Sequence, residues 1–232
     1  MEIHLSAEEI FGLKNFNITN TLILSFVITL GFLFFSKIIS SRLKLVPLRW
    51  QNFFEALIET ILNFMESVLE DKKKARKFFP LVATIFIFVI LSNWLEVLPG
   101  LGSIFLRSPS SDLNFTLAIA ISAVISIQVF GILSIGFIKY GKRFINFSSP
   151  INFFVGILEI ISEAAKIISF SFRLFGNIFA GEVLLIVVYF LAPYILPLPF
   201  MFLEIFVGFI QALVFSMLTL VFLKIATVEV EH

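Results

Sequence analysis

The chain has no cysteine and few charged residues. The lack of cysteine excludes disulfide frameworks, thiolate metal sites and cysteine nucleophiles. Charged residues make up 14% of the 232 positions, whereas soluble domains contain about 25%. The formal net charge is only +1, so no overall field indicates a nucleic acid or an acidic partner.

Three further features are missing. No glycine-rich loop ending in Lys-Ser or Lys-Thr is found, so we expect no nucleotide site, and nothing indicates a cofactor or a metal. No internal repeat supports the architecture of many secondary transporters. The N-terminus carries Glu2, Glu8 and Glu9 where a signal peptide has basic residues, so we expect no cleavable signal. Ser6 and Glu9 have capping-box spacing, which predicts a short surface helix there.

The sequence contains several long hydrophobic segments. Hydrophobic residues make up 59% of the chain and the mean hydropathy is +1.05. Several runs reach the roughly 20 residues that cross a bilayer core. We predict an all-α polytopic membrane protein with about five membrane helices and one amphipathic surface helix, forming one membrane domain over 1–232. The expected segments are an outer N-terminal segment 1–18, spans 19–40, 78–98, 113–139, 150–192 and 200–227, and the surface helix 47–71.

The surface helix has apolar residues at three- and four-residue intervals, from Trp50 to Val68, and polar residues on its other face. This pattern is typical of a helix on a membrane surface or against a partner helix. Basic residues follow the first span, precede the second and follow the third. The positive-inside rule therefore predicts a cytoplasmic location for those loops and an outer N-terminus.

The fourth apolar segment is too long for a simple span. As one helix, the stretch from Phe153 to Leu191 would measure about 58 Å, roughly twice the bilayer core. It therefore either breaks near Gly176 and Asn177 or tilts strongly. Three prolines, beginning at Pro193, then predict a turn before the last span.

Arg173 lies inside this segment, where a guanidinium is costly. Placing it at mid-bilayer costs at least about 2.5–3.5 kcal/mol, and arginine does not lose its proton. No acidic residue lies three or four positions away, so its counter-charge must come from another helix or another chain. A chain that accepts this cost needs a fixed positive charge within the membrane.

Other polar residues share the face of Arg173. At about 100° per residue, Glu159, Lys166 and Asn177 fall on one stripe with it, and Glu163 is spaced to pair with Lys166. The simpler alternative is that the stripe faces protein and its charges neutralise one another.

Carboxyl and amide groups also approach this face from elsewhere. Glu182 lies nine residues after Arg173, about 13 Å along the helix and on a different face. Glu204 and Gln211 share a face of the last helix; alternatively, Glu204 is an interfacial residue and Gln211 makes a helix–helix hydrogen bond. A fixed cation between two proton-accessible paths would force a proton to change carriers and so prevent a direct leak.

These motifs resemble one family. The Arg-Leu-Phe-Gly-Asn sequence from Arg173, the Ala-Gly-Glu sequence ending at Glu182, and Gln211-Ala212 are similar to subunit a of the rotary ATP synthase, and the resemblance is to its bacterial form. The segment 110–117 resembles the entry to that family's fourth helix. The resemblance covers most of the chain from about residue 75.

The resemblance implies a stator subunit that faces a ring of c subunits, each with one membrane carboxylate. Its last two helices would form a long tilted hairpin around the ring. Arg173 would face the ring carboxylate, with Asn177 and Gln211 beside it. The remaining site residues would line the two access paths: Glu182 and Glu204 on the inlet, Glu159 on the outlet, and Glu96 and Asp112 near the outer mouth.

The family also implies a non-catalytic subunit, because nucleotide chemistry then takes place in another subunit. Its partners would be the c-ring, the peripheral-stalk b subunits, the rest of the ATP synthase and the bilayer of a bacterial inner membrane, with a cytoplasmic C-terminus. Two rival interpretations are a standalone ion channel or secondary transporter, and a purely structural membrane subunit. The coupling ion, H⁺ or Na⁺, and the order of Glu182 and Glu204 stay open.

Overall fold

Five long apolar helices dominate the computed structural model, which describes residues 9–13, 16–41, 44, 49–95, 97, 108–144 and 150–228. They are α1 (Asn20–Ser41), α3 (Lys72–Trp94), α4 (Leu113–Ile135), α6 (Pro150–Leu191) and α7 (Pro197–Ala226). Each is long and apolar enough to cross a membrane. The all-α polytopic class is therefore confirmed.

Shorter elements connect the long helices. They are α2 (Arg49–Leu69), the 3₁₀ turn η1 (Pro109–Ser111) and α5 (Phe137–Phe144). The N-terminal region differs from the prediction, because β1 (Glu9–Leu13) and β2 (Phe16–Thr19) form an antiparallel hairpin. Glu9 therefore lies in a strand, and Ser6 is outside the described residues.

The turn between α2 and α3 is set by two acidic residues. Glu70 has a φ of 56°, which reverses the chain after α2. The Asp71 carboxylate then caps α3 by accepting from the amides of Lys73 and Lys74, at 2.8 and 3.2 Å. As a result, the basic run that begins at Lys72 forms the first turns of α3, and this helix begins earlier than expected.

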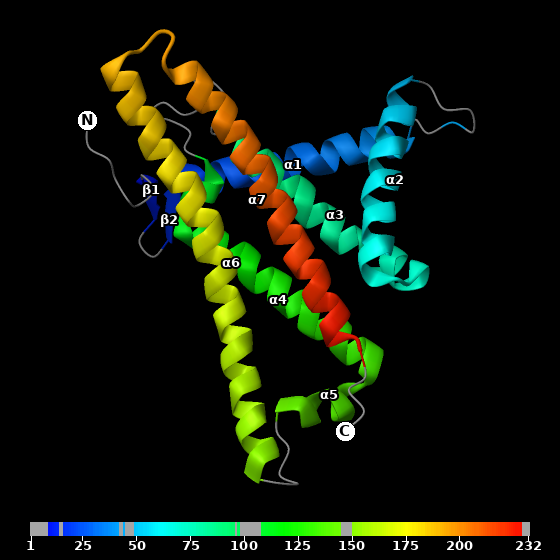
Figure 1. Ribbon diagram of the computed structural model, residues 1–232. Coiled ribbons are helices and arrows are strands. Elements are labelled where there is room, and N and C mark those ends of the chain that lie inside the picture. The colour runs from blue at the N-terminus through cyan, green and yellow to red at the C-terminus, as the bar shows by residue number, and fades with distance from the viewer. Residues whose placement is uncertain are drawn as a thin grey trace.

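The span expected over 113–139 ends early, at a glycine. Gly136 has a φ of 94°, a conformation that favours glycine, and it separates α4 from α5. The chain then folds α5 back onto α6 and α4. Figure 1 shows α5 beside the N-terminal end of α6, at the end of the molecule where the C-terminus also lies.

Helix α6 runs unbroken for 42 residues through Gly176 and Asn177. Its length is about 63 Å, so of the two alternatives the structure favours a steep tilt over a break. A three-proline turn follows, and α7 returns alongside α6 as a long antiparallel hairpin (Figure 1).

The core lies among α3, α4, α6 and α7. Near the middle, Phe170 and Leu174 of α6 pack with Phe215 of α7 and Val89 of α3. Toward the α5 end, a second cluster joins Phe78, Leu220 and Met65, so the C-terminal end of α2 is anchored there. These two clusters fix how α6 and α7 are placed relative to each other.

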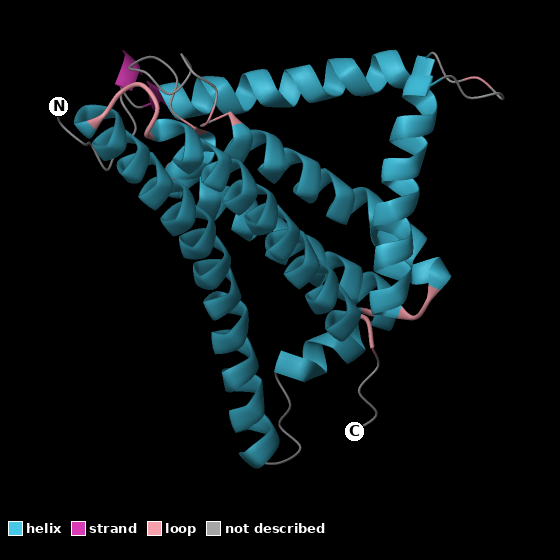
Figure 2. Ribbon diagram, turned by 45° about the horizontal axis from the view of Figure 1, so that its top comes forward, coloured by secondary structure: helices cyan, strands magenta, loops and turns pink. Residues whose placement is uncertain are grey.

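Helices α1 and α2 project from this core (Figure 2). Large apolar side chains such as Phe34 on α1 and Trp50 and Phe53 on α2 are exposed. Phe35 meets Phe54 edge-on, with ring centroids 5.9 Å apart, which joins the two helices at their shared corner.

Candidate functional site

Arg173 lies near the middle of α6, on a face that the rest of the chain leaves uncovered. Its guanidinium donates to the Ser169 hydroxyl one turn away, at 3.1 Å. Among the described residues no acidic side chain forms an ion pair with it. The sequence predicted a counter-charge from another helix or another chain. No described residue of this chain supplies it.

The same face of α6 carries small residues. Ser169, Gly176 and Ala180 are exposed around Arg173, and a methyl group added at Gly176 would meet nothing within 4 Å. Small residues let the backbone of a neighbouring helix approach closely. This face therefore combines a positive charge with small side chains, against which another helix could pack closely.

Asn177 and Gln211 link α6 to α7 beside the arginine. The Asn177 amide donates to the Gln211 side-chain oxygen at 2.8 Å. Gln211 is only 4% exposed, and its own amide nitrogen has no partner within the described ranges. The helix–helix hydrogen bond considered for Gln211 is confirmed, one turn from Arg173.

Glu204 of α7 is buried against α6. It is 7% exposed, and its carboxyl group lies directly over Gly181 of α6. A Cβ at Gly181 would overlap all three carboxyl atoms, so the Glu204 carboxyl can take this position only above a glycine. Oxygen Oε2 of Glu204 has no hydrogen-bond partner in the described part of the chain.

The wall of α3 beside Glu204 is also polar. The Asn93 amide donates to the Gly208 carbonyl of α7 at 3.0 Å, and the Trp94 ring nitrogen donates to the Ile205 carbonyl, also at 3.0 Å. Ser110 of η1 is fully buried, and its hydroxyl finds no partner among the residues described. Among the described residues, the α3 side of Glu204 therefore contributes neutral polar groups.

Glu182 follows Gly181 on α6 and is half-buried. It lies nine residues after Arg173 on the same helix, about 13 Å along the axis. Glu96, the other acidic residue expected near the outer mouth, lies outside the described residues.

Asp112 makes two structural contacts. One oxygen accepts from the Asn114 amide at 2.9 Å and so caps α4. The other accepts from the Thr21 hydroxyl of α1 at 2.8 Å. The structure thus gives this residue a capping and tethering position that its sequence context did not indicate.

At the α5 end the carboxyl groups are paired with cations. Glu163 contacts Lys166 at 2.6 Å, as the i,i+3 spacing predicts, and both are largely buried. Lys166 also lies over the Phe222 ring, 4.6 Å from its centroid. Glu159 pairs with Arg143 of α5 at 2.6 Å.

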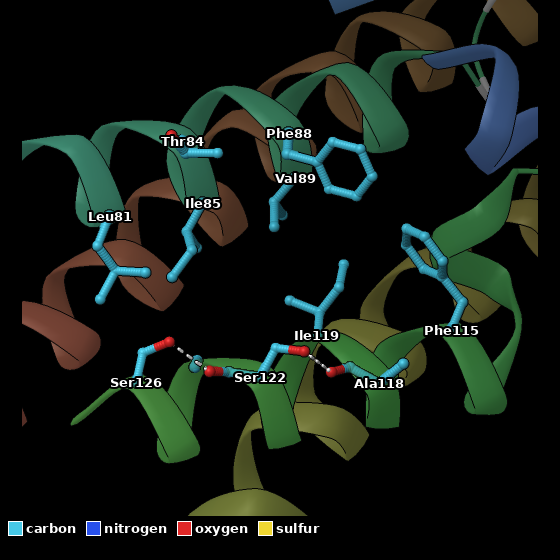
Figure 3. Close-up of a pocket in the computed structure, with 11 residues that line it drawn as sticks. Leu81, Thr84, Ile85, Phe88, Val89, Phe115, Ala118, Ile119, Ser122 and Ser126 are labelled. Atoms are coloured by element: carbon cyan, nitrogen blue, oxygen red, sulfur yellow. Dashed lines mark hydrogen bonds between the residues drawn. The ribbon is translucent and has the colours of Figure 1, made fainter. Parts of the chain in front are cut away.

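A groove of about 260 Å³ lies elsewhere, between α3 and α4 (Figure 3). Its lining is mainly apolar, with Phe88 and Phe115 at one end. The hydroxyls of Ser122 and Ser126 each donate to a backbone carbonyl one turn back, at 2.7 Å. Both hydroxyl groups therefore donate within α4. The residues that line the groove do not include Arg173 or the polar residues around it.

Sequence reasoning missed three residues of this arrangement. Gly181 was recognised only as part of a motif, although a glycine beside Glu182 was a signal for close approach. The pairing of Arg143 with Glu159 depends on the turn at Gly136, so no local signal indicates it. The hydrogen bond of Asn93 joins α3 to α7, segments that are 115 residues apart in the sequence.

The fold and the site together define a polytopic helical membrane protein with buried polar groups on both sides of Arg173, which has no acidic partner among the residues that the structure describes. The sequence pattern of the family "ATP synthase A chain" matches residues 20–224. The chain therefore belongs to the ATP synthase A chain family.

Curated relatives have the same length. A protein named ATP synthase subunit a from Campylobacter fetus is 36% identical over 231 residues, which is 100% of this chain and 99% of the relative. One from Campylobacter jejuni is 40% identical over 192 residues, covering 82% and 81% of the two chains. A more distant one from Moorella thermoacetica is 32% identical, with coverage of 95% and 96%.

Proposed function

We propose that this chain is the proton-translocating stator subunit of a bacterial ATP synthase. It would couple proton movement to rotation of a c-subunit ring, while nucleotide chemistry takes place in other subunits. Family membership and relatives named ATP synthase subunit a support this function.

One observation carries the mechanism. Arg173 is an exposed cation on a small-residue face of α6 and has no acidic partner among the described residues. A carboxylate on a neighbouring helix would supply the missing charge, and the open space at Gly176 would let that helix come close. The ring carboxylates are the partners that fit this chemistry.

The two sides of Arg173 would then act as separate access paths. On the side of the α6–α7 turn, Glu204 and Glu182 would deliver protons, with Asn177 and Gln211 orienting the groups beside the arginine. On the α5 side, Glu159 would receive protons that leave the ring. Glu96 would lie near the outer mouth with Asp112, whose main contribution is to hold α4 and α1.

The arginine prevents a direct leak for an electrostatic reason. A proton crossing between the paths would have to pass a permanent positive charge in a medium of low dielectric constant. The same charge stabilises the ionised form of a ring carboxyl that approaches it, so the carboxyl releases its proton there.

The orientation follows from the basic residues. Basic residues lie at the segments expected on the cytoplasmic side. They are Lys142 and Arg143 in α5 and the run from Lys72 at the start of α3. The N-terminus would then be outside, the C-terminus cytoplasmic, and residues 1–232 would form one membrane domain. The b subunits of the peripheral stalk and lipid would cover the apolar faces of α1 and α2.

The test is substitution of Arg173 in the assembled complex. Arg173→Ala is expected to abolish ATP-driven proton pumping in inverted membrane vesicles and to leave the subunit in the membrane. Lys44→Ala, at an exposed residue distant from α6, is the control. Pumping at the control level in Arg173→Ala vesicles would contradict the proposal, and loss of uptake of one particular solute would instead support a transporter.

A further inference from the structure

A second polar site lies where α4, α5 and α6 meet. We call it the α5 cluster, and it consists of Gln128, Tyr140, Arg143, Glu159, Glu163 and Lys166. The proposed function uses only Glu159 from this set, as the outlet carboxyl. The other members have no role in it.

Tyr140 is the centre of the cluster. It is 4% exposed, and its ring lies against Gly131 of α4, where a Cβ would overlap the ring. Its hydroxyl donates to the side-chain oxygen of Gln128 at 2.6 Å. The turn at Gly136 makes this contact possible, because it folds α5 back along α4.

Burial keeps the phenol of Tyr140 protonated. Burial raises the pKa of Tyr140 above its ordinary value of 10.0; Arg143 lowers it in part, and Glu163 and Glu159 raise it. The hydroxyl is therefore a hydrogen-bond donor at any physiological pH. It holds the Gln128 oxygen toward itself and so directs the Gln128 amide nitrogen away.

Two buried atoms remain unsatisfied in this cluster. The amide nitrogen of Gln128 has no acceptor and oxygen Oε2 of Glu163 has no donor, among the residues that the structure describes. One is a donor and the other an acceptor, and they come from facing helices. Buried polar atoms of this kind are normally satisfied by ordered water.

Glu163 is also placed between the arginine and the outlet. It lies ten residues from Arg173 and four from Glu159 on α6, which is about 15 Å and 6 Å along the helix axis. Lys166 satisfies one of its oxygens at 2.6 Å and leaves the other available. The gap between Arg173 and Glu159 thus contains one buried carboxyl with an unused oxygen.

We infer that the α5 cluster is a water-filled relay in which Glu163 carries protons toward Glu159, with Tyr140 and Gln128 as positioning residues and α5 as its cover. This inference deepens the proposed function and rests on it. Oxygen Oε2 of Glu163 accepts a proton from a water on the arginine side and returns it to a water on the Glu159 side. Each cycle therefore moves one proton and leaves the cluster unchanged.

Water in the cluster can be detected without measuring activity. Since the chain has no cysteine, Gln128→Cys introduces a single thiol into this subunit of the complete ATP synthase. A small methanethiosulfonate reagent reacts with thiolates, which form only in water, so we expect labelling at least about tenfold faster than at a dry site. The matched dry site is Ala123→Cys on the same helix, 1% exposed in the apolar core. Equal rates would overturn the inference.

Proton flux tests the role of the carboxyl. Glu163→Gln keeps the size of the side chain and an oxygen for Lys166, but it cannot ionise. Passive proton flux through the membrane sector is expected to fall by about tenfold or more, and Glu163→Asp should restore part of it. The control is Glu70→Gln. The Glu70 side chain is 83% exposed, and its carboxyl lies 3.8 Å from Lys224. Flux equal to the control would overturn the inference.

Tyr140→Phe separates positioning from packing. It keeps the ring against Gly131 and removes only the hydroxyl that orients Gln128. We expect flux to fall two- to threefold, on the order of one lost hydrogen bond, with the amount of assembled complex unchanged. Unchanged flux would show that Tyr140 only packs and would remove it from the relay. If Arg173→Ala abolishes pumping and Glu163→Gln does not reduce flux, only this inference fails and the proposed function stands.

Discussion

The two ends of the α6–α7 hairpin bury polar groups in different ways. Near the α6–α7 turn, Glu204 lies among neutral groups, with Asn93 on the neighbouring helix and Gly181 beneath its carboxyl. Near α5, Glu159 and Glu163 each contact a cation at 2.6 Å. Arg173 lies between the two ends without an acidic partner in the described part of the chain.

The two ends therefore differ in what holds their carboxyl groups. Glu204 packs against the α6 backbone at Gly181, whereas Glu159 and Glu163 are each held by the side chain of a lysine or an arginine.

The largest expected effect comes from breaking a pair at the charged end. Lys166→Met leaves the Glu163 carboxylate buried without its cation and should destabilise the subunit by about 3 kcal/mol. The measurement is the thermal inactivation midpoint of the solubilised complex. Lys72→Met, which breaks a 3.8 Å contact with Glu66 at a residue 81% exposed, should leave it unchanged. A similar midpoint for both variants would show that the two ends do not differ in this way.

At the neutral end the critical position is a glycine. Gly181→Ala forces the Glu204 carboxyl out of its place. We expect a loss of ATP-driven pumping with little change in stability, because the end of the Glu204 side chain can move aside. Gly31→Ala on α1 is the control, since a Cβ there meets nothing within 4 Å. If pumping survives Gly181→Ala, the contact between Gly181 and Glu204 does not matter for the inlet.

The middle of the hairpin should show a smaller effect. Asn177→Leu and Gln211→Leu each remove the 2.8 Å hydrogen bond between α6 and α7. In a double-mutant cycle on thermal stability we expect a coupling energy of about 0.6–2 kcal/mol. Additive single effects would mean that this bond does not stabilise the hairpin.

The smallest effect is expected at Asp112. Asp112→Asn keeps an oxygen for the Asn114 amide and should change stability by less than about 0.5 kcal/mol, whereas Asp112→Ala should cost about 1 kcal/mol. Proton flux in Asp112→Asn vesicles is expected to match that of the unmodified protein. A large drop in flux would instead require a charged carboxyl at this position.

The sequence predicted the long helices, and it predicted that Arg173 has no counter-charge on its own helix. Both predictions depend on signals within one segment. Long apolar runs, the cost of Arg173 and the i,i+3 spacing of Glu163 and Lys166 can all be read along one segment. The break or tilt of α6 could not be decided, since a glycine inside a helix costs only about 1 kcal/mol and packing easily outweighs it. The helix over Gly176 is therefore a result of the core around Leu174 and Phe215.

Contacts between distant segments could not be predicted in the same way. The pairing of Arg143 with Glu159 requires the positive φ of Gly136, which folds α5 back. The position of Glu204 over Gly181 depends on how α7 is aligned along α6, and that alignment is set by side chains in the core. The N-terminal hairpin was missed because a capping-box spacing was read as a helix start, although β1 contains Ile10 and Phe11, residues that suit strands.

The unbroken length of α6 also determines what a rotor can touch. A helix about 63 Å long fits within a bilayer core about half as thick only if it is strongly tilted. Residues at different depths along the helix are therefore also displaced from one another in the plane of the membrane. An upright rotor helix would cross such a tilted helix at one short stretch. In the proposed function, the entry and the exit would then open above different points of the rotor's circumference, and this offset would couple proton movement to rotation.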